Sequence, residues 1–294
     1  MKLTIANILL PTDFSPRSIA AVKYATALSR RFHSKLTLLH VIPPLDPAFV
    51  VMGNGGACLD QVLEAQRECT RSQLDSFLAD ELRGFQVKRI LMERDPAQAI
   101  VEYSRTQGVD LMVIPTRGSG VFRRFLLGSV TAKVLHDAPC PVWTGAHEEE
   151  TAVNNSWELR HVLCAVDPVA GDEAAVGWAA ELASAFHARL SVVHAIPSPS
   201  SNGGTYYLES ELHRLLGHDF KDRIAKMLCA NGNAPNVEIH VQSGPVARVV
   251  HSVAQDSRAD LVVIGHGTNR GFPGRLHTDA YAIVREAPCP VVSV

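Results

Sequence analysis

The chain repeats its own sequence pattern, and this internal duplication constrains the fold more than any other feature. Residues 7–13 (NILLPTD) match residues 161–167 (HVLCAVD) at an offset of 154. Further matches pair the segments 36–43 with 190–197, 110–114 with 260–264, and 138–142 with 287–291. The repeat predicts one domain present twice, the first half at residues 1–147 and the second half at 161–294, joined by a polar linker at 148–160.

Each half alternates short apolar, β-branched runs with amphipathic stretches. Runs that are apolar at consecutive positions, such as 111–114 (LMVI), are typical of parallel strands covered on both faces. In the first half the pattern predicts strands at 6–11, 35–42, 86–93, 109–115 and 140–144, and helices at 16–33, 58–83, 96–107 and 128–137. We therefore expect an α/β protein with two tandem doubly wound parallel five-stranded sheets flanked by helices.

Composition excludes several classes of partner. Apolar residues make up 46% of the 294 residues, and the net charge of −2 gives no reason to expect nucleic acid or an anionic membrane as a partner. The first residues run directly into a strand pattern, so we expect no leader peptide and no membrane span. None of the six cysteines forms a CxxC pair, which favours reduced thiols in a cytoplasmic protein over a zinc or redox site.

A glycine-bounded loop in the first half is suited to binding phosphate. Gly118 follows the strand at 109–115, and after nine intervening residues Gly128-Ser129-Val130-Thr131 opens a helix. Backbone N–H groups at a helix N-terminus attract anions, and glycine allows close approach of the backbone. Ser129 and Thr131 add hydroxyl groups, and Arg117 adds positive charge. Two simpler interpretations stay open here, because the glycines can merely shape a turn and the loop arginines can form a solvated face.

Three separate segments converge on this loop if the sheet is doubly wound. Ligands of such sheets bind beyond the carboxyl ends of the strands, at the switch point. The segment Pro11-Thr12-Asp13 ends the first strand, Val41 ends the second, and the loop that begins at Pro115 follows the fourth. An acidic group for ribose or adenine, an apolar residue for a base and a phosphate loop together predict a nucleotide site.

These residues resemble the universal stress protein family in its tandem, two-domain form. The resemblance covers nearly the whole chain and includes the segments 11–13 (PTD), 38–41 (LLHV), 127–135 (LGSVTAKVL) and 138–142 (APCPV). It implies a Rossmann-like fold of adenine-nucleotide-binding type and, in the first half, a site for ATP, ADP or AMP, with or without Mg²⁺. By resemblance, Thr12, Asp13 and Val41 contact adenine and ribose. The expected ribose and phosphate contacts are Gly118, Gly128, Ser129, Val130 and Thr131.

The chain departs from the pattern of the ATP-binding branch in two places. Pro115 stands where the family has its first glycine, so one backbone N–H is missing and we expect weaker binding. In the second half the loop is one residue shorter, and His277-Thr278 replaces Gly-Ser. A side chain at residue 277 blocks close approach of the backbone, and Asp279 repels phosphate. We expect this half not to bind ATP in the family manner.

The remaining candidates for chemistry favour structural roles. His40 and His194 lie at equivalent strand ends in separate halves, so we interpret them as structural histidines and expect no metal site. Cys140 and Cys289 lie between prolines and are expected to be buried and inert. The sequence contains no Walker A, GxSxG or HExxH motif, so we do not expect an enzyme beyond slow ATP hydrolysis involving Asp13.

Three functional hypotheses follow from the sequence. The favoured one is a cytoplasmic stress-response or signalling protein in which ATP bound by the first half stabilises a conformation that a protein partner recognises. The alternatives are a nucleotide-independent interaction protein and a weak ATPase.

The last strand of each half, at 141–144 and 290–294, would form a sheet edge that needs cover. In the resembled family these strands pair across a dimer, so we expect the two halves to pair within the chain as a pseudo-dimer, and a homodimer is a further possibility.

Overall fold

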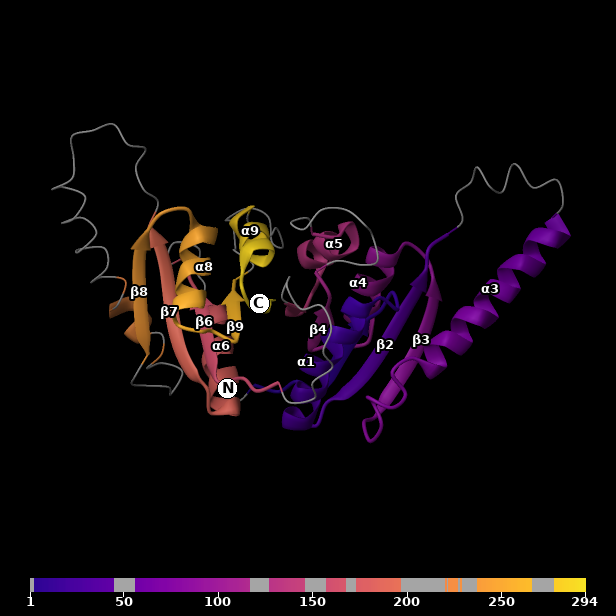
Figure 1. Ribbon diagram of the computed structural model, residues 1–294, viewed down its shortest axis with the longest axis horizontal. Helices are drawn as coiled ribbons and strands as arrows, with labels where there is room; N and C mark the ends of the chain where they lie inside the picture. The colour runs from indigo at the N-terminus through magenta and orange to yellow at the C-terminus, as the bar shows by residue number, and fades with distance from the viewer. Residues whose placement is uncertain are drawn as a thin grey trace, which may run out of the picture.

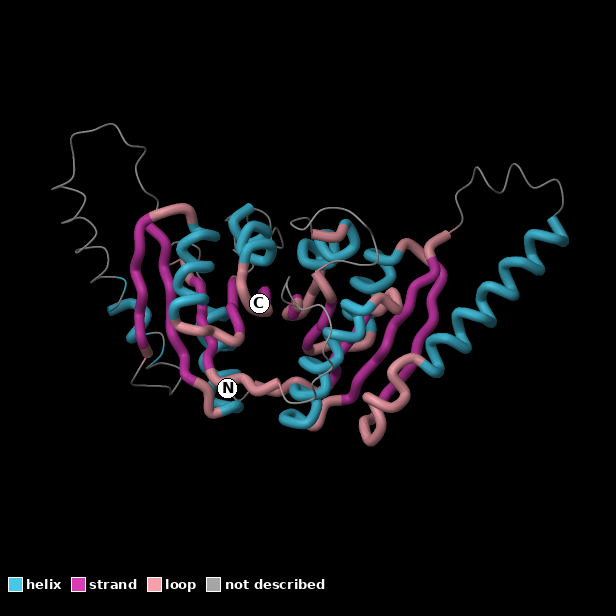
Figure 2. The backbone as a smooth tube through the Cα atoms, in the orientation of Figure 1, coloured by secondary structure: helices cyan, strands magenta, loops and turns pink. Residues whose placement is uncertain are grey.

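The chain folds into one continuous sheet of ten strands with helices on both faces (Figures 1 and 2). The computed structural model describes residues 3–44, 56–116, 127–145, 157–167, 173–196, 220, 222–226, 228, 237–265 and 278–294, with the backbone alone at 56–59 and 278. Within these ranges, no helix combines the length and the apolar character needed to cross a membrane.

The elements alternate along each half as the sequence predicts. The first half contains β1 (Asn7–Pro11), α1 (Pro16–Phe32), β2 (Lys35–Ile42), α3 (Gly56–Ser76), β3 (Val87–Glu93), α4 (Pro96–Thr106), β4 (Leu111–Ile114), α5 (Ser129–Asp137) and β5 (Val142–Thr144). The second half contains β6 (His161–Ala165), α6 (Glu173–Phe186), β7 (Arg189–Ile196), β8 (Glu238–Ser243), α8 (Val246–Asp256), β9 (Leu261–Ile264), α9 (Thr278–Glu286) and β10 (Val291–Ser293).

The strand order is β3-β2-β1-β4-β5-β10-β9-β6-β7-β8, and every pair is parallel except β5 with β10. Each half is therefore a five-stranded, doubly wound parallel sheet. The antiparallel pair aligns Trp143 with Val292 and fuses the two sheets into one. The predicted pairing of the last strands within the chain is confirmed, and neither strand is left as an exposed edge.

Alternate residues of each strand face different helices, as the pleat requires. Ile8 and Leu10 pack in a core on the α1 and α6 face, whereas Leu9 packs in a second core on the face of α4, α5, α8 and α9. The spacing of Ala21, Ala25 and Leu28 in the sequence (i, i+4, i+7) predicts that they share one face of α1, and all three are buried against the sheet. Their counterparts Ala175, Ala179 and Leu182 are buried as well.

One predicted element is shorter than expected. The helix predicted over 58–83 ends at Ser76, because Leu78 adopts a φ of 54° and Gly84 a φ of 88°. These left-handed values cannot continue a right-handed helix. Leu74, Leu78 and Leu82 stay buried in the same core, so the turns at 77–84 preserve the apolar contacts that the sequence pattern anticipated. Figure 1 shows α3 extending beyond β3 at the outer edge of the sheet.

Aromatic residues from separate segments meet where the two halves join. Trp143 on β5 is fully buried, and its ring lies 5.5 Å from Tyr24 and 5.4 Å from Trp157, measured between ring centroids. Trp157 belongs to the predicted linker, so the end of that segment packs against the first half. Across the same junction, the Tyr281 hydroxyl donates a 3.3 Å hydrogen bond to the carbonyl of Ala132.

Candidate nucleotide-binding site

The sheet of the first half has its switch point between β1 and β4. These strands are neighbours in register, with Ile8 beside Leu111, yet their connections run to opposite sides of the sheet. Segments that follow their carboxyl ends therefore lie at the same edge of the sheet, and doubly wound sheets bind ligands in the crevice at such a switch point. The segment Pro11-Thr12-Asp13 and the segment Pro115-Thr116 lie there, as the sequence predicts.

The turn after β1 is held by its own side chains. Thr12 is buried, its N–H donates a 2.9 Å hydrogen bond to Leu39, and its hydroxyl oxygen accepts from the N–H of Phe14 at 3.1 Å. One carboxylate oxygen of Asp13 accepts from the Ser18 hydroxyl at 2.7 Å and from the Ser15 N–H at 3.1 Å. Asp13 is exposed but positioned at the start of α1, where the helix dipole favours an anion.

Ser15 begins α1 in the way that the sequence predicts. Its hydroxyl oxygen accepts from the Ser18 N–H at 3.3 Å, and Pro16 follows in the first turn. The Ser18 hydroxyl that fixes Asp13 was not among the residues predicted for the site. Its signal in the sequence is the spacing Asp13-x-Ser15-x-x-Ser18, which places two hydroxyls within reach of one carboxylate.

Val41 and His40 lie near the end of β2 but have different environments. Val41 is buried in the core on the α4 and α5 face. The Nδ1 atom of His40 donates a 2.7 Å hydrogen bond to the carbonyl of Thr12, and the ring stacks on Phe14 at 4.3 Å. His194 makes the equivalent bond to Val166 at 2.9 Å. Both histidines therefore have the structural role predicted for them.

Two hydrogen bonds close the base of the loop that is predicted to bind phosphate. The N–H of Gly128 donates to the carbonyl of Thr116 at 3.0 Å, and the hydroxyl of Thr131 donates to the carbonyl of Pro115 at 2.9 Å. Thr116 and Thr131 are both buried. The loop between these anchors, with the predicted contacts Arg117 and Gly118, lies outside the described residues.

The N-terminus of α5 supplies backbone donors beside this loop. Gly128 is the N-cap, with φ −62° and ψ 144°, and the first intrahelical bond runs from Ala132 N–H to Gly128 O at 2.8 Å. The N–H groups of Ser129, Val130 and Thr131 precede that bond and so have no partner within the helix. The first turn of α5 contains no acidic residue, which leaves its positive dipole end uncompensated by the helix itself.

The hydrogen bond between Thr131 and Pro115 was not predicted from the sequence. The hydroxyl proton of Thr131 is directed to the Pro115 carbonyl, so in this structure it anchors the loop, and only its oxygen could accept another bond. Pro115 itself has no N–H, as its ring requires, and contributes its carbonyl to this anchor.

The corresponding part of the second half is only partly described. Asp167, the counterpart of Asp13, is exposed at the end of β6. Residues 266–277, which contain most of the shortened loop, lie outside the described residues, so its predicted degeneracy stays a prediction. Asp279 is exposed in the first turn of α9, where a negative charge opposes an anionic ligand.

The cysteines flanking the last strands are buried, as predicted for both. Burial raises the pKa of the Cys140 thiol to about 12, and the nearby Asp110 carboxylate contributes to the same shift. Cys289 occupies the equivalent position before β10 and is also buried. A thiol with so high a pKa is protonated at neutral pH and a poor nucleophile.

The fold and the crevice define a class: a tandem α/β protein of the Rossmann-like type, with a glycine-capped helix N-terminus at the switch point of the first sheet. Comparison with known families then places the chain. The model of the universal stress protein family matches residues 4–144 and again residues 158–294. The chain belongs to the universal stress protein family, in tandem form.

Similar proteins support this assignment over the full length. A universal stress protein of Mycolicibacterium smegmatis is 28% identical over 298 residues, which span 98% of this chain and 96% of the relative. Universal stress protein A homolog 1 of Coxiella burnetii is 30% identical over 46% of this chain and 95% of its own length. The crystal structure of a universal stress protein from Archaeoglobus fulgidus has the same fold, with a TM-score of 0.64, 21% identity, and coverage of 98% of this chain and 95% of that one.

Proposed function

We propose that the first half binds an adenine nucleotide, ATP or its products ADP and AMP, in the crevice between the ends of β1 and β4. The observation that carries the proposal is the closed base of the loop. The hydrogen bond from Gly128 N–H to Thr116 O holds the N-terminus of α5 at the carboxyl end of β4. The N–H groups of Ser129, Val130 and Thr131 then meet the phosphates, with or without Mg²⁺.

The other groups at the crevice suit the nucleoside. Asp13 is exposed, and its Oδ1 is held by Ser15 and Ser18, so its carboxylate is oriented before a ligand arrives. A carboxylate fixed in this way accepts hydrogen bonds from ribose hydroxyls or an adenine amino group. Val41 contributes apolar surface near the base. The proposed contacts at Pro11, Arg117 and Gly118 complete the set carried over from the family resemblance.

We propose that the second half does not bind ATP. The two helices that follow the fourth strand of each half differ in their first turn, because α5 has no acidic residue there and α9 has Asp279. A phosphate at the start of α9 would meet that carboxylate.

We propose that the chain acts in the cytoplasm as a stress-response module, in which nucleotide in the first half stabilises a conformation recognised by a protein partner.

The test is the thermal shift that ATP causes in the purified full chain. Gly128→Trp places a large side chain where the backbone must approach phosphate, and it should abolish the increase in melting temperature with millimolar ATP. The matched control is His277→Trp, which changes the equivalent position of the second half and should leave the increase intact. An ATP-dependent shift that survives Gly128→Trp, or is absent from the native chain, would refute nucleotide binding at this crevice.

A further inference from the structure

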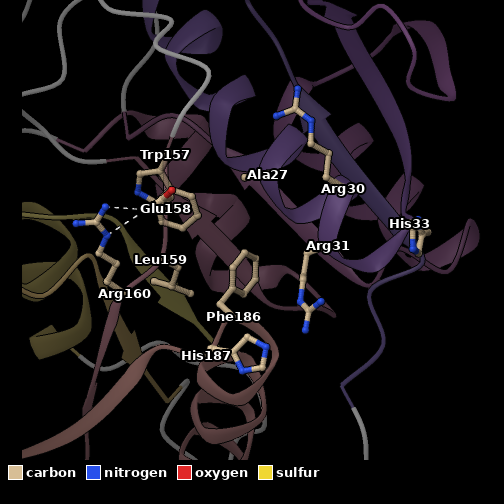
Figure 3. Close-up of a pocket in the computed structure, with 10 residues that line it drawn as sticks. All are labelled: Ala27, Arg30, Arg31, His33, Trp157, Glu158, Leu159, Arg160, Phe186 and His187. Atoms are coloured by element: carbon tan, nitrogen blue, oxygen red, sulfur yellow. Dashed lines mark hydrogen bonds and ion pairs between the residues drawn. The ribbon is translucent and has the colours of Figure 1, made fainter.

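A cavity of about 570 Å³ lies between the two halves, away from the nucleotide crevice. It is bordered by the end of α1, the segment 157–160 and the end of α6 (Figure 3). Its volume falls within the range of small-molecule sites. The N–H of Lys35, at the start of β2, donates a hydrogen bond to the carbonyl of Ala6, just before β1. The N–H of Arg189, at the start of β7, donates in the same way to the carbonyl of Arg160, just before β6. The junction cavity therefore lies at the amino ends of the strands. The nucleotide crevice lies at their carboxyl ends.

Basic side chains outnumber acidic ones on the rim of the junction cavity. Its basic side chains are Arg30, Arg31, His33, Arg160 and His187. The acidic group on the rim is Glu158, and it pairs with Arg160 at 2.7 Å. Within the described ranges, no carboxylate forms an ion pair with Arg31. Figure 3 shows Arg31 extending toward Phe186 and His187, whereas Arg30 extends the other way. The positive charge that faces the cavity without an acidic partner on its rim is therefore that of Arg31.

The arginines are not needed to end the helix. Helix α1 ends at Phe32 with His33 in a left-handed conformation, and α6 ends at Phe186 with His187 in the same conformation, at φ values of 57° and 56°. Where α1 has Arg30 and Arg31, the equivalent positions of α6 hold Ser184 and Ala185, and the last turn of α6 has no basic residue. The same helix termination occurs without them. Arg30 packs instead over the Phe85 ring, with its guanidinium carbon 5.1 Å from the ring centroid, which leaves Arg31 as the α1 arginine available to the cavity.

One wall of the cavity is apolar and aromatic. Leu159 is buried, and the rings of Trp157 and Phe186 line the wall. Trp157 is held edge-on against Tyr24 at 5.0 Å, and Phe186 meets Phe32 of the first half at 6.1 Å. Aromatic rings offer flat surface against which a ligand ring can stack. The site thus combines an apolar wall with the guanidinium of Arg31 on its rim.

We propose that the junction cavity binds a compact organic anion, a flat apolar group that carries a phosphate. The guanidinium of Arg31 offers the paired N–H donors that phosphate accepts, and His187 faces the same part of the cavity from the other half. The apolar group lies against Trp157 and Phe186. Because the lining residues come from both halves, the bound anion links them and stabilises their association. This proposal does not depend on the nucleotide site.

The test uses phenyl phosphate as the probe, titrated into the full chain in an isothermal calorimeter. We expect saturable binding with one site per chain, and the double variant Arg31→Gln with His187→Gln should raise Kd at least about tenfold. Both residues are exposed, so this variant should fold, and its melting temperature without ligand checks that it does. Arg105→Gln, which removes an exposed arginine of α4 outside the cavity, should leave Kd unchanged.

Two comparisons separate this site from other sources of binding. Phenyl phosphate should bind the Gly128→Trp chain with unchanged Kd, because that substitution affects only the nucleotide crevice. Inorganic phosphate should bind at least about tenfold more weakly than phenyl phosphate, since it cannot use the aromatic wall. No binding of the probe, an unchanged Kd in the double variant, loss of binding in Gly128→Trp, or equal affinity for inorganic phosphate would each overturn the proposal.

Discussion

The hydroxyl of Thr131 donates a 2.9 Å hydrogen bond to the carbonyl oxygen of Pro115, joining the first turn of α5 to the end of β4. Both residues are buried, so neither group has water as an alternative partner. Together with the bond from Gly128 to Thr116, this contact fixes where the proposed phosphate loop leaves and re-enters the fold.

Replacing Thr131 by valine should destabilise the first half. Valine keeps the shape of threonine but leaves the buried Pro115 carbonyl without its donor, so we expect a loss of about 1–3 kcal/mol in the free energy of unfolding. Urea denaturation followed by circular dichroism measures this loss. Thr131→Ser keeps the hydroxyl and should recover most of the stability. A valine variant as stable as the native chain would show that the hydrogen bond contributes nothing.

Trp143 should be the most sensitive position of the junction between the halves. Its side chain is fully buried among Tyr24, Trp157 and β10, so Trp143→Ala should cost about 3–5 kcal/mol. Its indole N–H has no hydrogen-bond partner among the described residues. Trp143→Phe should therefore cost much less, because it keeps most of the ring and removes an unpaired donor. Equal losses in the two variants, measured by denaturation, would argue against this packing role.

His161 should make stability depend on pH. Burial lowers the pKa of this histidine below its ordinary value of 6.5, while its ring bonds the Ser191 hydroxyl at 2.7 Å and the Ser257 carbonyl at 3.1 Å. Below about pH 6.5 the unfolded chain takes up the proton before the folded chain does. The contribution of His161 is therefore complete above that pH and is lost as the pH falls toward the folded-state pKa.

The matched variant for this effect is His161→Asn, because the first half has Asn7 at the equivalent position. Denaturation at several pH values between 5 and 8 should give a steeper loss of stability on acidification for the native chain than for the variant. The difference in slope should not exceed about 1.4 kcal/mol per pH unit, the limit for one proton. Parallel curves would mean that His161 is not the titrating group.

Thiol labelling should distinguish exposed from buried cysteines. Cys69 lies on the exposed surface of α3, whereas Cys140 is buried and its pKa is raised to about 12. At neutral pH a thiol reagent should modify Cys69 within minutes and reach Cys140 only after denaturant unfolds the chain. Peptide mapping by mass spectrometry locates each label. Labelling of Cys140 at the same rate as Cys69 in the native chain would contradict its burial.

Much of the fold could be predicted because each signal was local and repeated. The spacing of Ala21, Ala25 and Leu28 defined one helix face, and the consecutive apolar residues of β4 indicated a strand buried on both sides. The pairing of β5 with β10 was expected from the resemblance to the family, in which the equivalent strands pair across a dimer. The end of α3 could not be predicted, because Leu78 adopts a left-handed conformation and leucine is not a residue type that indicates one.

The sequence predicted which residues belong to the candidate site, but not the hydrogen bonds that those residues make. The sequence indicated Asp13 and Thr131, but it could not show that Ser18 holds one and that Pro115 receives the hydroxyl of the other. Such contacts depend on the angle at which a loop closes, which residue types alone do not determine. Trp157 was missed for a related reason, because a lone aromatic in a polar segment gave no indication of its partners Tyr24 and Trp143.

The proposed first-half site predicts one bound adenine nucleotide per chain, with none in the second half. Equilibrium dialysis of the full chain against labelled ATP, taken to saturation, counts the nucleotides bound per chain. We expect a count near one in the native chain and in His277→Trp, and near zero in Gly128→Trp. A count near two, a count near zero in the native chain, or binding that persists in Gly128→Trp would contradict it.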